Sequence, residues 1–236
     1  MKRVAIICGG RSSEHPISCI SARGVLGAID RKTYEPVLIG ITEDGNWVQL
    51  ESADAFVIGS DGLPYVPNSN DVLNVDIHGI KDSQGKNLKI DLAFPLLHGA
   101  YGEDGTVQGL FEMADIAYVG SGVLASAVAM DKTFAKPIYA DFGLNVADGI
   151  TIHEREWKNN KALERAKISA LGFPVFIKPA RSGSSRGTSK VKSESGIDKA
   201  IEEAHKHDPR AMVEVAIRGR EIECAVLEIN GKATAS

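Results

Sequence analysis

Residues 3–10 read RVAIICGG, and this short stretch indicates the fold of the first half of the chain. The apolar run from Arg3 to Cys8 predicts a buried strand that ends at a Gly-Gly turn. A helix is expected to follow, because residues repeat at helical spacing behind the turn. The repeating positions are Ile17, Ile20, Gly24, Val25 and Ala28. A strand, a loop and a helix in this order are typical of a parallel sheet with crossover helices.

The same order returns further along the first half. Tyr34 to Ile41 predicts a second strand, and Asp44-Gly45 predicts a short hairpin after it. Residues 51–90 carry no clear period, so they predict no element. Leu92 to Leu97 predicts a third strand, and the turn-rich string HGAYGEDG follows it at residues 98–105. The next helix is marked by Val107, Leu110, Phe111 and Ala114. Ligands of parallel sheets bind at the carboxyl ends of strands, so the loops after Cys8 and Leu97 are expected to bind one.

The second half has an α+β pattern, in which helices and strands do not alternate as in the first. Its expected elements are a helix through Leu163, Ala166, Ala170 and Leu171, a strand over Val175 to Lys178, a strand at Lys190-Val191, a helix through Ile197, Ala200, Ile201 and Ala204, and strands over Met212 to Val215 and Glu221 to Ile229. Ser195 and Asp198 resemble a capping box for the second of these helices. We expect a domain boundary near residue 122, which gives domains 1–122 and 123–236.

The sequence ends soon after a hairpin signal. Asn230-Gly231 predicts a tight turn, yet only Lys232 to Ser236 follow it. The returning strand would form an uncovered sheet edge, which proteins usually avoid. These residues therefore suggest a chain that is truncated at its C-terminus.

Composition excludes several classes of protein. Of 236 residues, 43% are hydrophobic and 25% are charged, and the net charge is −4, so no general nucleic-acid-binding surface is indicated. No apolar run approaches the roughly 20 residues needed to span a bilayer. Cys8, Cys19 and Cys224 are odd in number and lack CxxC spacing, which argues against disulfides and zinc clusters. We expect a cytoplasmic globular protein that binds neither nucleic acid nor membrane.

Two candidate site regions lie in the first domain. Gly9-Gly10 and Glu14 precede a helix N-terminus, where anions can bind, although Glu14 is also an ordinary first-turn acid. His98 and Glu103 follow a strand within a glycine-rich loop, and both can orient or protonate a substrate. Asp104 in the same loop can simply cap the next helix.

Two more candidate regions lie in the second domain. Lys178 precedes the Gly/Ser-rich loop of residues 181–189, which can wrap phosphates or be only a mobile hairpin loop. No Walker A pattern occurs, and Lys132 taken alone is an ordinary surface lysine. Glu214, Glu221 and Glu223 either mark the solvent face of a strand or include an acceptor for ribose hydroxyls.

Taken together, five strings in the chain resemble the D-alanine–D-alanine ligases of the ATP-grasp superfamily. They are GGRSSEHPIS, FPLLHGAYGEDGTVQG, YVGSGVLASAVAMDK, FIKPARSGSSRGTSKV and VEVAIRGREIE, in this order. The resemblance covers nearly the whole chain and is weakest across residues 51–90. It implies an α/β fold, with an N-terminal, Rossmann-like pre-ATP-grasp domain, an ATP-grasp central domain and a missing C-terminal part.

The resemblance also implies an activity. The family joins two D-alanines with ATP and magnesium, for which manganese can substitute, in the synthesis of peptidoglycan precursors. The first carboxylate becomes an acyl phosphate, which the amine of the second D-alanine attacks. Catalysis of this kind rests on positioning and on neutralising the charge of the transferred phosphoryl group. A homodimer in the cytoplasm is implied as well.

Roles for particular residues follow from the same resemblance. Glu14 would bind the ammonium of the first D-alanine, His98 would lie beside it, and Glu103 would help to hold Glu14 and Ser184. The residues that would bind ATP are Lys132 and Lys178 at the phosphates, Ser184, Ser185 and Gly187 in a closing loop, Glu214, Val215, Ala216 and Ile217 along the adenine, and Glu221 at the ribose. No metal ligand is assigned to this chain, because the family carries its magnesium ligands in the missing segment.

The chain departs from the family at Pro16, where many relatives have an acid, and at Arg186, where an aliphatic residue is usual. Because the metal site would be missing, residues 1–236 alone are not expected to turn over substrate. Three functions remain open from the sequence. They are a D-alanine–D-alanine ligase, a ligase that takes D-lactate or D-serine as its second substrate, and a non-catalytic nucleotide-binding protein.

Overall fold

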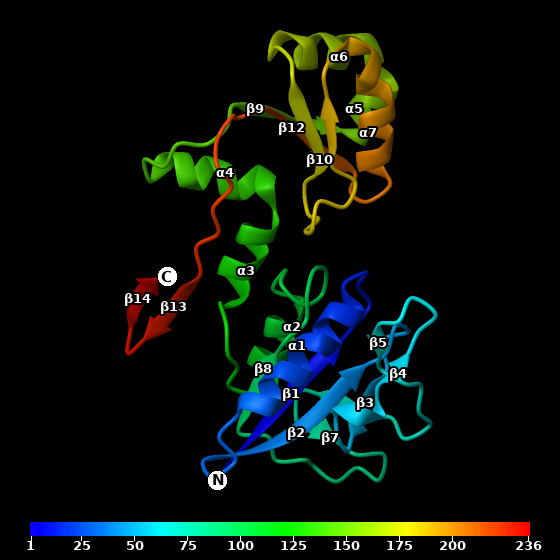
Figure 1. Cartoon of the computed structure of the whole chain (residues 1–236), viewed down its shortest axis with the longest axis vertical. Helices are drawn as coiled ribbons and strands as arrows, with labels where there is room; N and C mark the ends of the chain where they lie inside the picture. Colours follow the sequence, from blue (N-terminus) through cyan, green and yellow to red (C-terminus); the bar gives the residue numbers. More distant parts are fainter.

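The computed structural model describes all residues from 1 to 236 (Figure 1). A first lobe, residues 1–121, and a second lobe, residues 149–215, each contain one main sheet, and two helices join them. The joining helices are α3 (Val123–Met130) and α4 (Lys132–Asp141). None of the helices combines the length and the apolarity that crossing a bilayer requires.

The first lobe contains a four-stranded sheet in the order β3-β2-β1-β8. Strands β1, β2 and β8 run parallel, and β3 returns antiparallel to β2 after the turn at Asp44-Gly45. Its main elements are β1 (Lys2–Gly9), α1 (His15–Ala28), β2 (Tyr34–Ile41), β3 (Trp47–Leu50), β8 (Leu92–Pro95) and α2 (Thr106–Met113). The parallel sheet and every element predicted here from the sequence are therefore confirmed.

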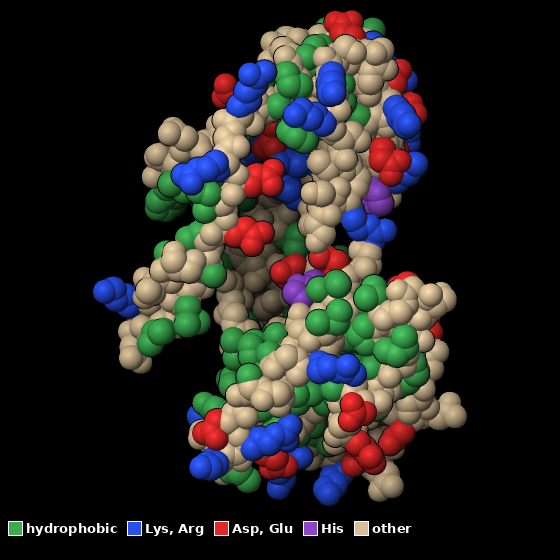
Figure 2. Space-filling view, viewed as in Figure 1, with side chains coloured by type: hydrophobic (Ala, Val, Ile, Leu, Met, Phe, Trp, Pro, Cys, Tyr) green, Lys and Arg blue, Asp and Glu red, His purple; other side chains and the backbone are tan.

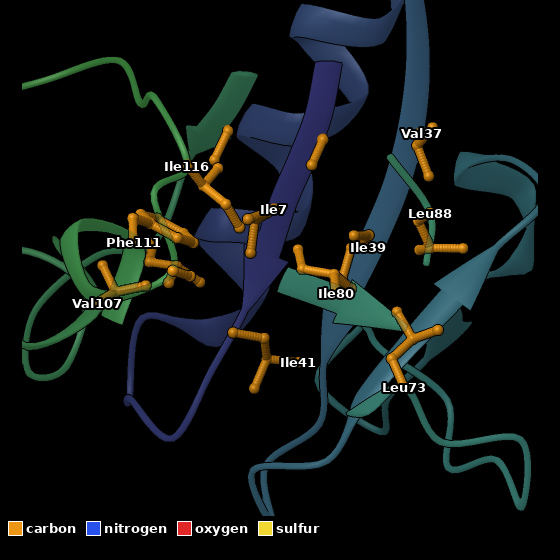
Figure 3. Packing of buried hydrophobic residues seen from close by; sticks show 14 residues of the cluster. Ile7, Val37, Ile39, Ile41, Leu73, Ile80, Leu88, Val107, Phe111 and Ile116 are labelled. Atoms are coloured by element: carbon orange, nitrogen blue, oxygen red, sulfur yellow. The ribbon is translucent and has the colours of Figure 1, made fainter. Parts of the chain in front are cut away.

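Strand β1 is central because both of its faces are buried. Val4, Ile6 and Cys8 point to the side covered by α1, whereas Ala5 and Ile7 point to the side covered by α2. Figure 3 shows the second side, where residues of β1, β2, β7 and α2 pack together. Successive side chains of a strand alternate between faces, so a continuous apolar run is what a doubly covered strand requires.

Helix α1 lies where the sequence predicts it but buries a different face. Ile17 and Ile20 are 46% and 47% exposed, whereas His15, Ser18 and Cys19 are fully buried. Small and hydrogen-bonding side chains face β1 because the side chains of His15 and Ser18 satisfy backbone groups of neighbouring turns. A pattern that treats polar residues as outward-facing cannot recognise such a face.

Residues 51–90, for which the sequence predicts no element, form short irregular structure around the sheet edge. The elements are a 3-10 turn (Ala53–Ala55), β4 (Val57–Ile58), β5 (Pro64–Tyr65), β6 (Asn74–Asp76) and β7 (Gly79–Lys81). Leu73, Ile80 and Leu88 from this segment are buried in the core of the first lobe. Strands of two or three residues are too short to show a period of two, so no strand could be predicted in this segment.

The second lobe contains an antiparallel sheet in the order β11-β10-β12-β9, with helices on one face. Its elements are β9 (Gly149–His153), α5 (Glu154–Asn159), α6 (Lys161–Ala170), β10 (Val175–Pro179), β11 (Ser189–Val191), a 3-10 turn (Glu194–Gly196), α7 (Ile197–His205) and β12 (Arg210–Val215). All four residues predicted to form the apolar face of α7 are buried. The predicted α+β class is confirmed.

Two local predictions in the second half are wrong. Ser195 and Asp198 form no capping box, because the Ser195 hydroxyl lies 3.0 Å from that of Ser193 and Asp198 pairs with Lys161 and Arg165. The strand expected over Glu221 to Ile229 is confined to β13 (Val226–Ile229).

The hairpin predicted at Asn230-Gly231 is present. Both residues have positive φ, 52° and 76°, and β14 (Lys232–Ala235) returns antiparallel to β13. In Figure 1 this hairpin lies apart from the two main sheets, and all its residues are exposed.

Candidate functional site

The loops that follow β1 and β8 lie together at the carboxyl edge of the first sheet. A Cβ atom added to Gly99 would lie 2.9 Å from Oε2 of Glu14, so the two loops are in close contact. Glu103 accepts a 2.6 Å hydrogen bond from the Gly99 amide, and the His98 imidazole Nε2 lies 3.2 Å from the Ser21 hydroxyl. Glu14, His98 and Glu103, which the sequence singles out, are thus gathered at one edge, where a parallel sheet binds ligands.

Two buried side chains hold the loop that carries Glu14. The His15 imidazole donates from Nδ1 to the Gly10 carbonyl at 2.9 Å and accepts from the Val66 amide at 3.0 Å. The Ser18 hydroxyl accepts from the Gly9 amide at 2.8 Å and donates to a carbonyl of the loop after β8 at 2.6 Å. Sequence reasoning missed both residues, because their only signal is their position beside the Gly-Gly turn.

The helix after the second loop has Gly105 and not Asp104 at its N-cap, so the interpretation of Asp104 as the cap is wrong. Gly105 has a φ of 89°, which suits glycine, and it occupies the N-cap position of α2. Asp104 still stabilises the turn, since its carboxylate accepts from the amides of Thr106 and Tyr101 at 3.0 and 2.9 Å. Asp104 therefore stabilises the turn before α2 without occupying its N-cap position.

The Gly/Ser-rich loop between β10 and β11 extends from the second lobe toward the first (Figure 1). Ser184, Ser185 and Gly187 have positive φ values of 46°, 57° and 67°. The Ser184 hydroxyl donates a hydrogen bond to Oε1 of Glu14. This is the only hydrogen bond between the first lobe and residues 131–236. It joins two sequence-predicted residues that are 170 positions apart in the chain.

Figure 2 shows the hollow between the two lobes, with acidic side chains and a histidine along its rim. One cavity in this region has a volume of about 590 Å³, and its lining includes His98, Glu103, Lys132, Ser182 and Gly183. The first lobe contributes a histidine and a carboxylate to this cavity, the joining helix α4 contributes a cation, and the second lobe contributes loop backbone. Such a cavity suits a ligand with both an ammonium and an anionic group.

Lys132 is not the solvated surface lysine that its sequence context alone suggested. Its ammonium donates to the Ser182 carbonyl at 2.6 Å, at the base of the Gly/Ser-rich loop. Burial and the nearby charge of Lys178 lower the pKa of Lys132 below its ordinary value. The two lysines therefore create a positive potential beneath the loop, which favours binding of an anion.

Glu214 is buried beside two lysines, so the interpretation of this acid as a solvent-face residue is wrong. In the pairing of β10 with β12, Glu214 lies opposite Phe176, two residues before Lys178. Alternate residues of a strand share a face, so Lys178 and Glu214 lie on the same face of the sheet, the one opposite the helices. Lys178 pairs with one carboxylate oxygen of Glu214 and Lys136 with the other. Burial opposes the charge, yet hydrogen bonds from both lysines hold the pKa of Glu214 below its usual value. Sequence reasoning missed Lys136, whose only signal is its spacing of four residues from Lys132.

The chain leaves the sheet after Val215, the last residue of β12. The amides of Val215 and Ala216 donate to the Asp148 and Pro174 carbonyls at 2.9 and 3.0 Å, whereas Ile217 makes no backbone hydrogen bond. Ile217 is 70% exposed, and Glu221 and Glu223 are exposed too. The segment after β12 therefore offers an unpaired amide and carbonyl at Ile217, three residues beyond the buried Glu214.

Asp131, at the start of α4, anchors this helix to the second lobe. Its carboxylate accepts from the Thr133 amide and hydroxyl at 3.0 and 2.6 Å, and it pairs with Arg210. Although burial disfavours the charge, these bonds lower the pKa of Asp131. The stabilisation is thus present above the pKa of the unfolded chain, about 4, and is lost as the pH falls through the lower folded value.

Replacing Asp131 by asparagine is expected to lower the free energy of unfolding by about 2 kcal/mol at pH 7, because a charge-assisted pair is lost. The difference from the wild type should shrink as the pH falls below about 4, which urea denaturation at several pH values would measure. Asp198→Asn, at a partly exposed ion pair, is the matched control and should cost less than about 1 kcal/mol. A difference for Asp131→Asn that stays constant down to pH 3 would contradict the assignment.

Comparison with known proteins places this arrangement in a family. Residues 3–121 match the family model described as "D-ala D-ala ligase N-terminus", and residues 138–236 match "D-ala D-ala ligase C-terminus". The D-alanine–D-alanine ligase of Paenarthrobacter aurescens is 48% identical over 97% of this chain and 63% of its own length. That of Streptomyces coelicolor is 44% identical over 99% of this chain and 65% of its own length.

Solved structures agree with these matches. The D-alanine–D-alanine ligase from Coxiella burnetii superposes with a TM-score of 0.86 at 34% identity, covering 100% of this chain and 69% of that one. The VanG D-Ala:D-Ser ligase from Enterococcus faecalis gives 0.85 at 35% identity, covering 99% and 68%. The chain spans about 63% of the length of its first curated relatives. The resemblance noted in its motifs is thereby confirmed, and the chain belongs to the D-alanine–D-alanine ligase family.

Proposed function

We propose that the protein containing these residues is an ATP-dependent ligase that joins two D-alanines. The observation that carries this proposal is the hydrogen bond between Ser184 and Glu14. It brings a carboxylate suited to an ammonium group next to a loop whose base is held by Lys132. Binding an amino acid and a phosphate donor side by side is the geometry that carboxylate activation needs.

In this proposal Glu14 binds the ammonium of the first D-alanine, and His98 and Glu103 lie beside it. Lys132 and Lys178 neutralise the phosphates of ATP while the first carboxylate is phosphorylated, and the second amine then attacks the D-alanyl phosphate. The carboxylate is a poor electrophile until one of its oxygens becomes phosphate, which is a good leaving group. The loop through Ser184 excludes water during these steps, so the activated carboxyl is not hydrolysed.

Two residues that flank the second lobe in the chain have free groups that fit ATP. Lys132 has only carbonyl oxygens as partners, so its charge is available to a phosphate. Ile217 has an unpaired backbone amide and carbonyl that suit the edge of an adenine. Around them we assign Ser185 and Gly187 to the closing loop, and Glu221 to the ribose hydroxyls.

Magnesium, which the family implies, does not fit any group of side chains in this chain. No three His, Cys, Asp or Glu side chains are gathered as metal ligands within residues 1–236. No residue of this chain is therefore assigned as a ligand of the metal. The wider setting that we propose is peptidoglycan precursor synthesis in the cytoplasm by a homodimer, with residues 1–122 binding D-alanine and residues 123–236 binding nucleotide.

The test is an assay of the complete protein with ATP, magnesium and D-alanine, followed by ADP release and by mass spectrometry of the product. The proposal expects ADP release that depends on D-alanine, together with D-alanyl-D-alanine. D-Serine and D-lactate are tested in parallel, because one structural neighbour is named as a D-Ala:D-Ser ligase. Preference for either would assign the second substrate differently, and tight ATP binding without turnover would favour a non-catalytic nucleotide-binding protein.

A further inference from the structure

The ion cluster around Glu214 joins four segments of the second half of the chain. Lys136 comes from α4, Lys178 from β10 and Glu214 from β12, and the Lys136 ammonium also donates to the Ala147 carbonyl at 2.5 Å, in the segment before β9. The side chains of Glu214 and Lys136 are only 11% and 16% exposed. A carboxylate this buried requires a cation partner, because an uncompensated buried charge is strongly destabilising.

The two lysines differ in their other partners. Lys136 has two protein acceptors, the Glu214 carboxylate and the Ala147 carbonyl. Lys178 has only Glu214, and its charge is close enough to Lys132 to disfavour the charged form of that lysine. An anion bound between Lys132 and Lys178 would relieve this repulsion. Lys178 can therefore turn away from Glu214 toward an incoming phosphate, whereas Lys136 remains paired with Glu214.

We propose that Lys136 is a positioning residue for nucleotide binding, which keeps Glu214 in place and compensated when Lys178 turns toward the phosphates. This inference rests on the proposed function, since it assumes that the anion at Lys178 belongs to ATP. Lys136 itself needs no contact with the nucleotide. It acts through Glu214 at the start of the segment that leads to the unpaired backbone of Ile217.

Removing Lys136 should weaken ATP binding in particular. In Lys136→Met, Lys178 is the only cation left for the buried carboxylate, so ATP must break that pair to recruit Lys178. We expect the KM for ATP to rise roughly tenfold, as for a lost buried charge contact, with kcat and the KM for D-alanine changing by less than about twofold. Lys136→Arg should restore most of the affinity, because a guanidinium can donate to both Glu214 and Ala147.

Lys167→Met is the matched control. Lys167 pairs with the buried Glu164, whose side chain is 3% exposed, on α6, away from the cluster. Its loss should lower thermal stability without changing the KM for ATP. A second comparison uses Glu214→Gln, which removes the charge that Lys136 compensates. Adding Lys136→Met to Glu214→Gln should therefore raise the KM for ATP no further.

The kinetic constants of the complete protein and its variants decide the question, with melting temperatures measured alongside. An unchanged KM for ATP in Lys136→Met would overturn the inference, and so would a fall in kcat alone, which is what a smaller folded fraction produces. Additive effects of Lys136→Met and Glu214→Gln would instead indicate direct contact between Lys136 and ATP. If the wild type shows no D-alanine-dependent ADP release, the proposed function itself fails, and this outcome is separate from the others.

Discussion

Replacing Glu14 by glutamine in the complete protein is expected to lower kcat/KM for D-alanine about a hundredfold, as expected for the loss of a charge-assisted contact. Glutamine has nearly the same shape and can still accept the hydrogen bond from Ser184. It lacks the negative charge that binding an ammonium requires. The KM for ATP should change little, because Glu14 contributes to the amino-acid side of the site. Steady-state kinetics with each substrate varied in turn would measure both effects.

Glu35→Gln provides the matched control for this substitution. Glu35 lies at the start of β2, at the opposite edge of the sheet, and pairs with Arg3 while its own side chain is 48% exposed. The same chemical change there should leave the kinetics unaltered. If Glu14→Gln were equally silent, Glu14 would be only an acid that complements the dipole of α1, as its sequence position also allowed.

Replacing Gly9 by alanine is expected to destabilise the first lobe by about 3–5 kcal/mol, because steric clash and backbone strain act together. Gly9 has a φ of 86°, and an added Cβ would lie 2.3 Å from the Ile41 carbonyl oxygen. That oxygen cannot move away freely, since it accepts a 2.8 Å hydrogen bond from the Gly10 amide. Urea denaturation followed by circular dichroism would measure the loss as a lower midpoint.

Gly24→Ala tests the same change without the clash. Gly24 lies within α1, has no positive φ, and its added Cβ would meet nothing within 4 Å. Alanine there should stabilise the helix by about 0.5–1 kcal/mol, through its higher helix propensity. If Gly9→Ala and Gly24→Ala changed the free energy of unfolding equally, the turn after β1 would be able to rearrange around the added methyl group, and the prediction would be wrong.

Most strands of the two main sheets could be predicted because they are long or strongly patterned, whereas the edge strand β9 was missed. The continuous apolar run of β1 and the four buried residues of α7 are such signals. The buried face of α1 could not be predicted, since His15 and Ser18 are buried through hydrogen bonds to backbone groups that are distant in sequence. The short strands of residues 51–90 have stability only through tertiary contacts, which local sequence does not reveal.

The residues of the candidate site, like the elements of the fold, could be predicted only in part from the sequence. Motif resemblance identified Glu14 and Ser184, and the structure joins them. Lys136 was not predicted, because its spacing of four residues from Lys132 is common among lysines of a helix and does not indicate a buried contact. Its contact with Glu214 spans 78 positions in the chain and exists only when α4 packs against the sheet. Charge compensation of this kind is a property of the folded arrangement and of no local motif.

The isolated Ser184–Glu14 hydrogen bond also bears on how substrate affinities should be interpreted. A single hydrogen bond of this kind contributes about 1–3 kcal/mol, so the approach of the two lobes competes closely with their separation. When only a fraction of molecules has the lobes together, the apparent dissociation constant is the intrinsic one divided by that fraction. Substitutions in residues 122–130, which link the lobes, can thus alter affinity by shifting this population, without touching either ligand.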